Sequence, residues 1–174
     1  MPTAKIKIED AADALLSGNV QKNAQDLFAF MRTNKMNPMQ TSTSGWKVSS
    51  KGCVVCYIWV NADSLVINPF IGEYKRTAVS DKIREIALAK KSPGTSCPIC
   101  HVIVGDEYPC SYKIKAIFGK ELIDACARSI LFKNPSHNEI ECVKELLLLR
   151  KDTIKNGILL PNSPKNYTHG DTII

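Results

Sequence analysis

The sequence predicts an α+β protein in which an antiparallel meander sheet of three or more strands packs against N-terminal and C-terminal helices. The first observation is a segment rich in β-branched and aromatic residues, Cys53 to Val60, with shorter segments of the same kind on either side. The second is the helical spacing of apolar residues before and after these strands. The third is a composition typical of globular domains, with 44% hydrophobic and 23% charged residues.

Two helices are expected before the first strand. The first runs from Asp10 to Ser17 and ends at Gly18, because glycine tolerates the left-handed conformation that follows many helix ends. The second is capped by Asn19 and carries an apolar stripe that is most simply core. The stripe consists of Val20, Ala24, Leu27, Phe28 and Met31.

The sheet is expected to follow a loop between Met36 and Gly45, which is rich in Asn, Pro, Gln, Thr and Ser. Turns around Gly52 and Asp63 then separate the three strands. The predicted strands are Trp46–Ser49, Cys53–Val60 and Leu65–Phe70.

The C-terminal half is predicted to hold three more helices. The first begins at Ser80–Asp81 and ends near Lys90, and the second runs from about Glu121 to Ile130. Ser136 and Glu139 form a capping box that begins the last one. Val102–Val104 and Tyr112–Phe118 are expected as short strands.

The chain is expected to form one domain over residues 1–160, with a Cys-rich knuckle inserted at 92–112 and a flexible tail at 161–174. The start has no signal-peptide pattern, and the apolar runs are far shorter than the roughly 20 residues that span a bilayer. We therefore expect a cytoplasmic protein without membrane contact. The sequence does not indicate an oligomeric state.

Seven cysteines are many for a cytoplasmic chain, where disulfides are disfavoured. Cys97 and Cys100 have the spacing of a zinc knuckle, and they follow a Pro-Gly loop. Cys110 and Cys126 are expected to complete four ligands, with His101 as an alternative. A closed set of four protein ligands predicts a structural zinc ion, because no position remains for a substrate.

The same cysteines have other interpretations. Free cysteine is often buried as a small hydrophobe, which suits Cys126 and also Cys53, Cys56 and Cys142. A thiol-redox enzyme would use Cys97 and Cys100, but the following segment favours a strand and not the helix that activates such thiols. The covalent haem-attachment pattern at residues 97–101 is expected on exported chains.

Three aromatic residues are the candidate ligand-binding site. Tyr57 and Trp59 lie two apart on one strand and project from the same face, which Trp46 on the neighbouring strand is expected to join. A small molecule would stack there, with Asn68 or a cationic side chain as its polar contact. The alternative is a packed aromatic cluster under the helices.

Other function classes have weaker support. The formal net charge is +6, but lysine and arginine are scattered without a dense block, which does not favour nucleic-acid binding. The three histidines lie in unrelated segments and no phosphate-binding glycine motif occurs, so no catalytic residues are predicted. A binding or regulatory module is therefore favoured over an enzyme.

Several motifs together resemble a family of small, functionally uncharacterised bacterial proteins. The resemblance covers most of residues 20–155 and implies an α+β domain with shared cysteine use, but no activity. Relatives carry Cys-Pro-Gly after the first cysteine pair, whereas Pro109–Cys110 lacks the glycine, which leaves the role of Cys110 open. The matching motifs are Val55–Ile58, the cysteines Cys97, Cys100 and Cys110, Phe118–Glu121 with Cys126, Phe132–Pro135, Glu141–Lys144 and Arg150.

Overall fold

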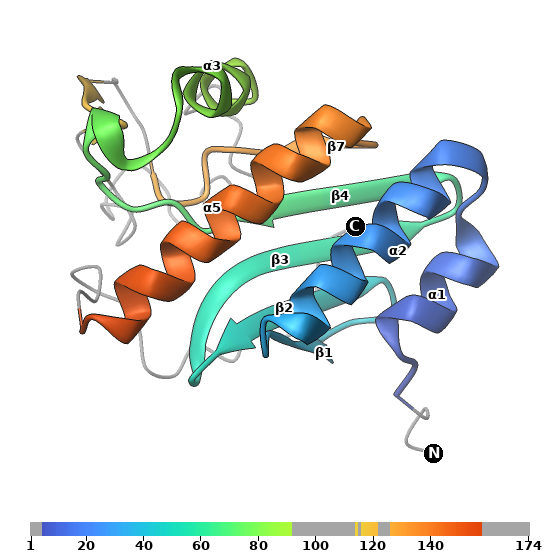
Figure 1. Cartoon of the computed structure of the whole chain (residues 1–174). Helices are drawn as coiled ribbons and strands as arrows, with labels where there is room; N and C mark the ends of the chain where they lie inside the picture. The colour runs from blue at the N-terminus through green and yellow to red at the C-terminus, as the bar shows by residue number, and fades with distance from the viewer. Residues whose placement is uncertain (1–4, 92–113, 115, 122–125, 158–174) are drawn as a thin grey trace, which may run out of the picture.

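The protein forms an α+β fold, as predicted, in which helices pack on one face of a five-stranded antiparallel sheet (Figure 1). The computed structural model describes residues 5–91, 114, 116–121 and 126–157, so the predicted knuckle and tail lie outside the described residues. The helices are α1 (Ile8–Leu15), α2 (Gly18–Thr33), the 3-10 helix η1 (Arg76–Ala78), α3 (Asp81–Ala89) and α5 (His137–Lys155). The strands are β1 (Asn37–Gln40), β2 (Gly45–Ser50), β3 (Cys53–Asn61), β4 (Ser64–Pro69), β5 (Ala116–Ile117), β6 (Lys120–Glu121) and β7 (Phe132–Lys133).

The strands β2, β3 and β4 are the predicted meander, and the sheet has the order β1-β2-β3-β4-β7. The edge strands β1 and β7 were not predicted. The β1 residues include Pro38, which has no N–H to donate and is tolerated in a sheet mainly at an edge. Strand β7 has only two residues, which pair with Val66 and Ile67 of β4. The strands β5 and β6 form a separate hairpin.

The N-terminal helices differ slightly from their predicted bounds. Helix α1 begins at Ile8, because the Ala11 N–H already donates to the Lys7 carbonyl at 3.1 Å. Gly18 has the predicted left-handed conformation, with φ +57°. However, Ser17 and not Asn19 is the N-cap of α2.

The predicted helix at residues 121–130 is wrong in the described residues. Glu121 belongs to β6, and residues 126–130 form a turn and short bridges. Carbonyls of this segment accept hydrogen bonds from groups that are distant in the sequence. The Asn68 side-chain amide donates to the carbonyls of Arg128 and Ile130, and the Ile71 N–H donates to the carbonyl of Ala127.

The two predicted C-terminal helix starts are confirmed. The Ser80 hydroxyl accepts from the Ile83 N–H at 3.3 Å at the start of α3. The Ser136 N–H donates to Glu139 Oε2 at 2.7 Å in the capping box of α5. An ion pair between Lys90 and Glu139 connects the end of α3 to the start of α5.

The core lies between the helices and one face of the sheet. Four residues of the predicted α2 stripe are buried, namely Ala24, Leu27, Phe28 and Met31, while Val20 is partly buried against them. Helices α1, α2 and α5 pack on this face, and α3 contacts α5 (Figure 1). No described helix is both long and apolar enough to span a bilayer. Part of the predicted aromatic site, Tyr57 and Trp59, lies on the opposite face of the sheet.

Candidate functional site

The three predicted aromatic residues lie on two different faces of the sheet. The β2–β3 register pairs Trp46 with Ile58 and Lys47 with Tyr57. Paired residues of antiparallel strands project to the same side. Trp46 therefore points toward the helices, where it is only 2% exposed, and it does not join Tyr57 and Trp59 as expected.

Tyr57 and Trp59 form a stacked pair on the other face. Their ring centroids are 6.1 Å apart and the ring planes differ by 22°, so the two rings are stacked and nearly parallel. Both side chains are half-buried. We call this side of the sheet the aromatic face, and its residues are Lys47, Tyr57, Trp59, Val66, Asn68 and Lys133, with Arg128 above Tyr57.

The absence of a side chain at Gly45 allows Trp59 to lie close to strand β2. The register places Gly45 directly opposite Trp59. A Cβ atom at residue 45 would lie 3.3 Å from both Cδ1 and Nε1 of Trp59 and 2.6 Å from Ser42 Oγ. Trp59 thus lies against the backbone of β2, which gives the indole a defined support.

Arg128 contributes a cation to the aromatic face. Its guanidinium carbon lies 4.2 Å from the Tyr57 ring centroid, a cation–π distance. Its Nε–H donates to Asn68 Oδ1 at 3.2 Å, and Asn68 Nδ2 donates to the Arg128 carbonyl at 2.9 Å. Asn68 is only 4% exposed, so a buried amide holds both the main chain and the side chain of Arg128. The structure thus places Asn68 and a cation beside Tyr57.

The charges of the five-stranded sheet have one sign. Lys47 and Lys133 are the only charged residues in β1, β2, β3, β4 and β7, and both belong to the aromatic face. Lys47 lies opposite Tyr57 on β2, and Lys133 lies opposite Val66 on β7. The aromatic pair therefore has a cation on each side.

The cysteines divide into two chemical environments. Cys97, Cys100 and Cys110, together with His101, lie outside the described residues. Cys56 and Cys142 are completely buried, as the alternative interpretation expected. Burial raises the pKa of both thiols, that of Cys142 to about 12, so they remain protonated and unreactive.

Cys126 lies in a turn that directs hydrogen-bond donors at its sulfur. The Arg128 N–H and the Ser129 hydroxyl lie 3.4 Å and 3.5 Å from Sγ. The Ser129 oxygen in turn accepts from the Cys126 N–H at 2.8 Å. Donors directed at a sulfur stabilise the thiolate, which is the form that binds metals. Among the described cysteines, this turn suits a ligand best.

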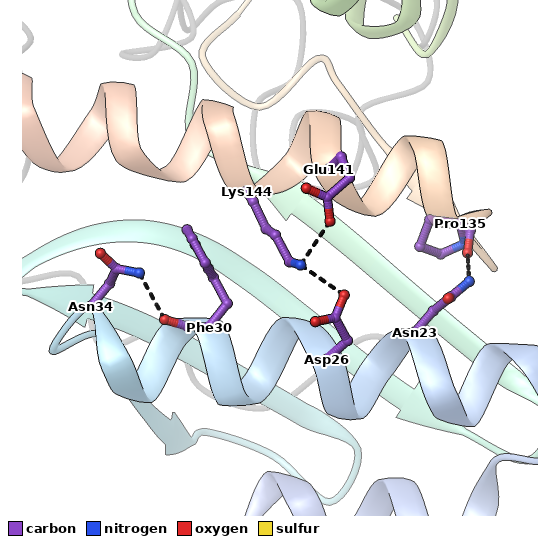
Figure 2. Close-up of polar contacts among 7 residues, drawn as sticks. All are labelled: Asn23, Asp26, Phe30, Asn34, Pro135, Glu141 and Lys144. Carbon is purple, nitrogen blue, oxygen red and sulfur yellow. Dashed lines mark hydrogen bonds and ion pairs between the residues drawn. The ribbon is translucent and has the colours of Figure 1, made fainter.

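A second cluster of metal-ligand type connects α2 and α5. Ligand atoms of Asp26, His137 and Glu141 lie within 4.8 Å of one another, and all three side chains are exposed. However, Lys144 Nζ lies 2.7 Å from carboxylate oxygens of both Asp26 and Glu141 (Figure 2). Burial alone would lower the pKa of Lys144, but these two hydrogen bonds raise it above its ordinary value. A metal ion would have to displace this ammonium group.

Arg150 is a buried cation that the sequence did not single out as functional. It is 1% exposed, and its guanidinium carbon lies 5.0 Å from the Phe70 ring centroid. Its Nε–H donates to the Val54 carbonyl at 3.3 Å, while Nη1 has no hydrogen-bond partner among the described residues. It lies in the core and away from the aromatic face, so it is a structural feature.

Comparison of the chain with protein-family models, with curated proteins and with solved structures finds no match. The fold therefore defines an α+β protein with helices on one sheet face, and the candidate site is defined by the geometry of the aromatic face.

Proposed function

We propose that the protein is a binding module whose aromatic face binds a planar, anionic ligand. The observation that carries this proposal is the stacked Tyr57–Trp59 pair with a cation on each side. Flat aromatic rings attract planar ligands, and lysine or arginine at the rim favours ligands with negative charge. The five strands contain no Asp or Glu, which also favours a negatively charged ligand.

We propose that the site binds its ligand without a catalytic step. Asn68 and Arg128 bond to each other, so their polar groups hold the geometry of the face. Lys47 has three N–H donors and a flexible stem with which to reach an anionic group. Such a module is expected in the cytoplasm, where thiols such as those of Cys56 and Cys142 stay reduced.

We also propose that a zinc ion stabilises the domain through Cys97, Cys100, Cys110 and Cys126. The donor-rich turn around Cys126 supports this, because it favours a thiolate there. Bound zinc would cross-link this turn, which precedes β7, to the segment that follows α3. Its role is structural, since four protein ligands fill a tetrahedral site.

Fluorescence of Trp59 tests the proposed binding. The chain has two tryptophans, so a Trp46→Phe variant reports Trp59 alone. The indole N–H of Trp46 has no hydrogen-bond partner among the described residues, so this change removes a buried, unpaired donor. Adenosine monophosphate should quench this emission at lower concentration than neutral adenosine. Equal or absent quenching by the two compounds contradicts the proposal.

A further inference from the structure

We propose that the ligand of the aromatic face is a single-stranded nucleic acid. This inference rests on the proposed function, because it specifies the ligand of the same surface. It reverses the expectation from the sequence, in which the basic residues are scattered along the chain. In the fold, Lys47, Arg128 and Lys133 come together around Tyr57 and Trp59 from segments more than 80 residues apart.

The first argument is stacking. Every nucleobase has a flat π surface, so half-buried aromatic rings on a sheet can stack with bases without reading their sequence. Trp59 lies close to the β2 backbone at Gly45 and stacks with Tyr57, and because the indole is half-buried, a base would stack on the part that remains exposed. Tyr57 lies beside it, and the Arg128 guanidinium above Tyr57 is itself a planar group on which a base can stack.

The second argument is charge. Helices α1, α2 and α5 together carry eight Asp and Glu residues, whereas the five strands carry none. These eight negative side chains thus lie on helices that cover the other face of the sheet, and the charged side chains of the aromatic face are all basic. A polyanion would approach this face without meeting a carboxylate from the sheet. Base stacking combined with a basic surface is typical of single-strand binding proteins.

The third argument is size. Lys47 and Lys133 lie on β2 and β7, which are separated by three strand spacings of about 4.8 Å, or about 14 Å in total. Sheet platforms of this width stack about two or three bases. A single strand crossing β2, β3, β4 and β7 can therefore place a base at the Tyr57–Trp59 pair on β3 and its phosphates near the two lysines. Among the described residues no helix projects from the aromatic face to insert into a duplex groove, which favours a single strand over a duplex.

The experiment uses the Trp46→Phe protein with ten-nucleotide oligomers of uridine and of thymidine. Either oligomer should quench Trp59 at far lower concentration than adenosine monophosphate. With about three phosphates neutralised, affinity should fall about 20-fold between about 50 mM and 200 mM salt. If Trp46→Phe does not fold, anisotropy of a labelled oligomer with the unmodified protein gives the same measurement.

Three variants locate the binding. Trp59→Leu should weaken oligomer binding about five- to 150-fold, as expected for the loss of one stacked base. Lys47→Gln should weaken it and reduce the salt slope by about 0.7, whereas Lys22→Gln should leave both unchanged. Lys22 is a matched control because it is an exposed lysine on α2, within the helical layer.

The outcomes separate the two proposals. Quenching by adenosine monophosphate without tighter binding of either oligomer overturns the nucleic-acid inference and leaves the proposed function standing. No quenching by any of these ligands overturns both. Oligomer binding that Lys47→Gln and Lys22→Gln weaken equally places the nucleic acid elsewhere, and this result also overturns the inference.

Discussion

The side-chain amide of Asn68 donates to the main-chain carbonyl of Ile130 at 2.7 Å, in a buried hydrogen bond between residues 62 positions apart in the chain. The same amide donates to the Arg128 carbonyl, and its oxygen accepts from the Arg128 side chain. Asn68 therefore ties the segment before β7 to strand β4, and it positions Arg128 over Tyr57.

Asn68→Leu should destabilise the protein and weaken ligand binding together. The change leaves two buried carbonyls without their donor, at about 1–3 kcal/mol each, and releases Arg128. Urea unfolding measures the first effect and Trp59 quenching measures the second. In Asn68→Asp the acceptor for Arg128 remains, but both donated bonds are lost and a carboxylate enters the aromatic face, so stability should fall and an anionic ligand should bind more weakly than to Asn68→Leu. Equal losses of binding in the two variants would contradict this effect of the charge.

Gly45→Ala should disturb Trp59 without disturbing the core. The added methyl group lies 2.6 Å from Ser42 Oγ and 3.3 Å from the Trp59 ring, so both side chains must move. The double variant Ser42→Ala/Gly45→Ala removes the close contact with Ser42 Oγ, so it isolates the effect of the added methyl group on Trp59. We expect a shifted Trp59 emission and weaker binding in both variants, measured in the Trp46→Phe background. Unchanged emission in the double variant would show that Trp59 does not depend on the small residue at 45.

Zinc should co-purify with the protein at one equivalent per chain. Replacing one of the four ligands weakens zinc binding, so Cys126→Ser should lower the zinc content and the melting temperature. Cys53→Ser is the matched control, because Cys53 is half-buried on β3 and belongs to no proposed ligand set. Elemental analysis of protein purified without added metal provides the measurement. Absence of zinc, with all seven thiols reactive after unfolding, would refute the metal proposal.

The Glu139 carboxylate should stabilise the fold at pH values above the ordinary carboxyl pKa, and this stabilisation should be lost at lower pH. Burial raises its pKa, but hydrogen bonds from Lys90 and Ser136 outweigh this and lower it below the ordinary value of 4.5. Because the folded-state pKa is depressed, the stabilisation is complete above about pH 4.5 and is lost as the pH falls through the folded value. Glu139→Gln removes the ion pair with Lys90 and the negative charge at the helix N-terminus, so it should cost about 0.5–1 kcal/mol at pH 7 and less as the pH falls below 4.5 toward about pH 3, as measured by urea unfolding.

Glu85→Gln is the control for this pH dependence. Glu85 is an exposed residue of α3 outside the capping box, so its replacement should change stability by less than about 0.5 kcal/mol at either pH. A cost for Glu139→Gln that is the same at both pH values would contradict the predicted role of the ionised carboxylate.

Arg150→Met should change stability little or increase it. Arg150 is buried, with one guanidinium nitrogen lacking a hydrogen-bond partner among the described residues. Replacing a buried charge with an apolar side chain of similar length is often neutral or stabilising. Leu147→Ala on the same helix is the contrast, with an expected loss of about 2–5 kcal/mol from a cavity in the core. A loss of that size in Arg150→Met would show that the Val54 hydrogen bond and the Phe70 contact outweigh the cost of burying the charge.

Much of the fold follows from local signals in the sequence. The meander strands are marked by β-branched residues between turns, and the starts of α3 and α5 by capping residues that bond as expected. Strand β1 and the turn at Cys126 were missed, because non-local partners determine both. Pro38 and its polar neighbours become a strand only through pairing with β2. The turn is held by Asn68, which is far away in the sequence.

The candidate site was predicted in part for a related reason. The two-residue spacing of Tyr57 and Trp59 is enough to place them on one face. The face of Trp46 depends on the register between β2 and β3, which includes an irregularity at Val48 and Ser49. A shift of one residue moves a side chain to the other face, and composition does not reveal it. The placement of Lys47 and Lys133 on this face depends on β-sheet pairing in the same way, whereas that of Arg128 depends on its hydrogen bonds with Asn68.

Both edges of the sheet are poor templates for self-association. Unpaired backbone groups on an edge strand invite pairing with a second chain, which leads to aggregation. Pro38 removes one donor from β1, and β7 offers an edge of only two residues. A sheet with such blunt edges can present aromatic side chains on one face at high protein concentration without extending into intermolecular sheets.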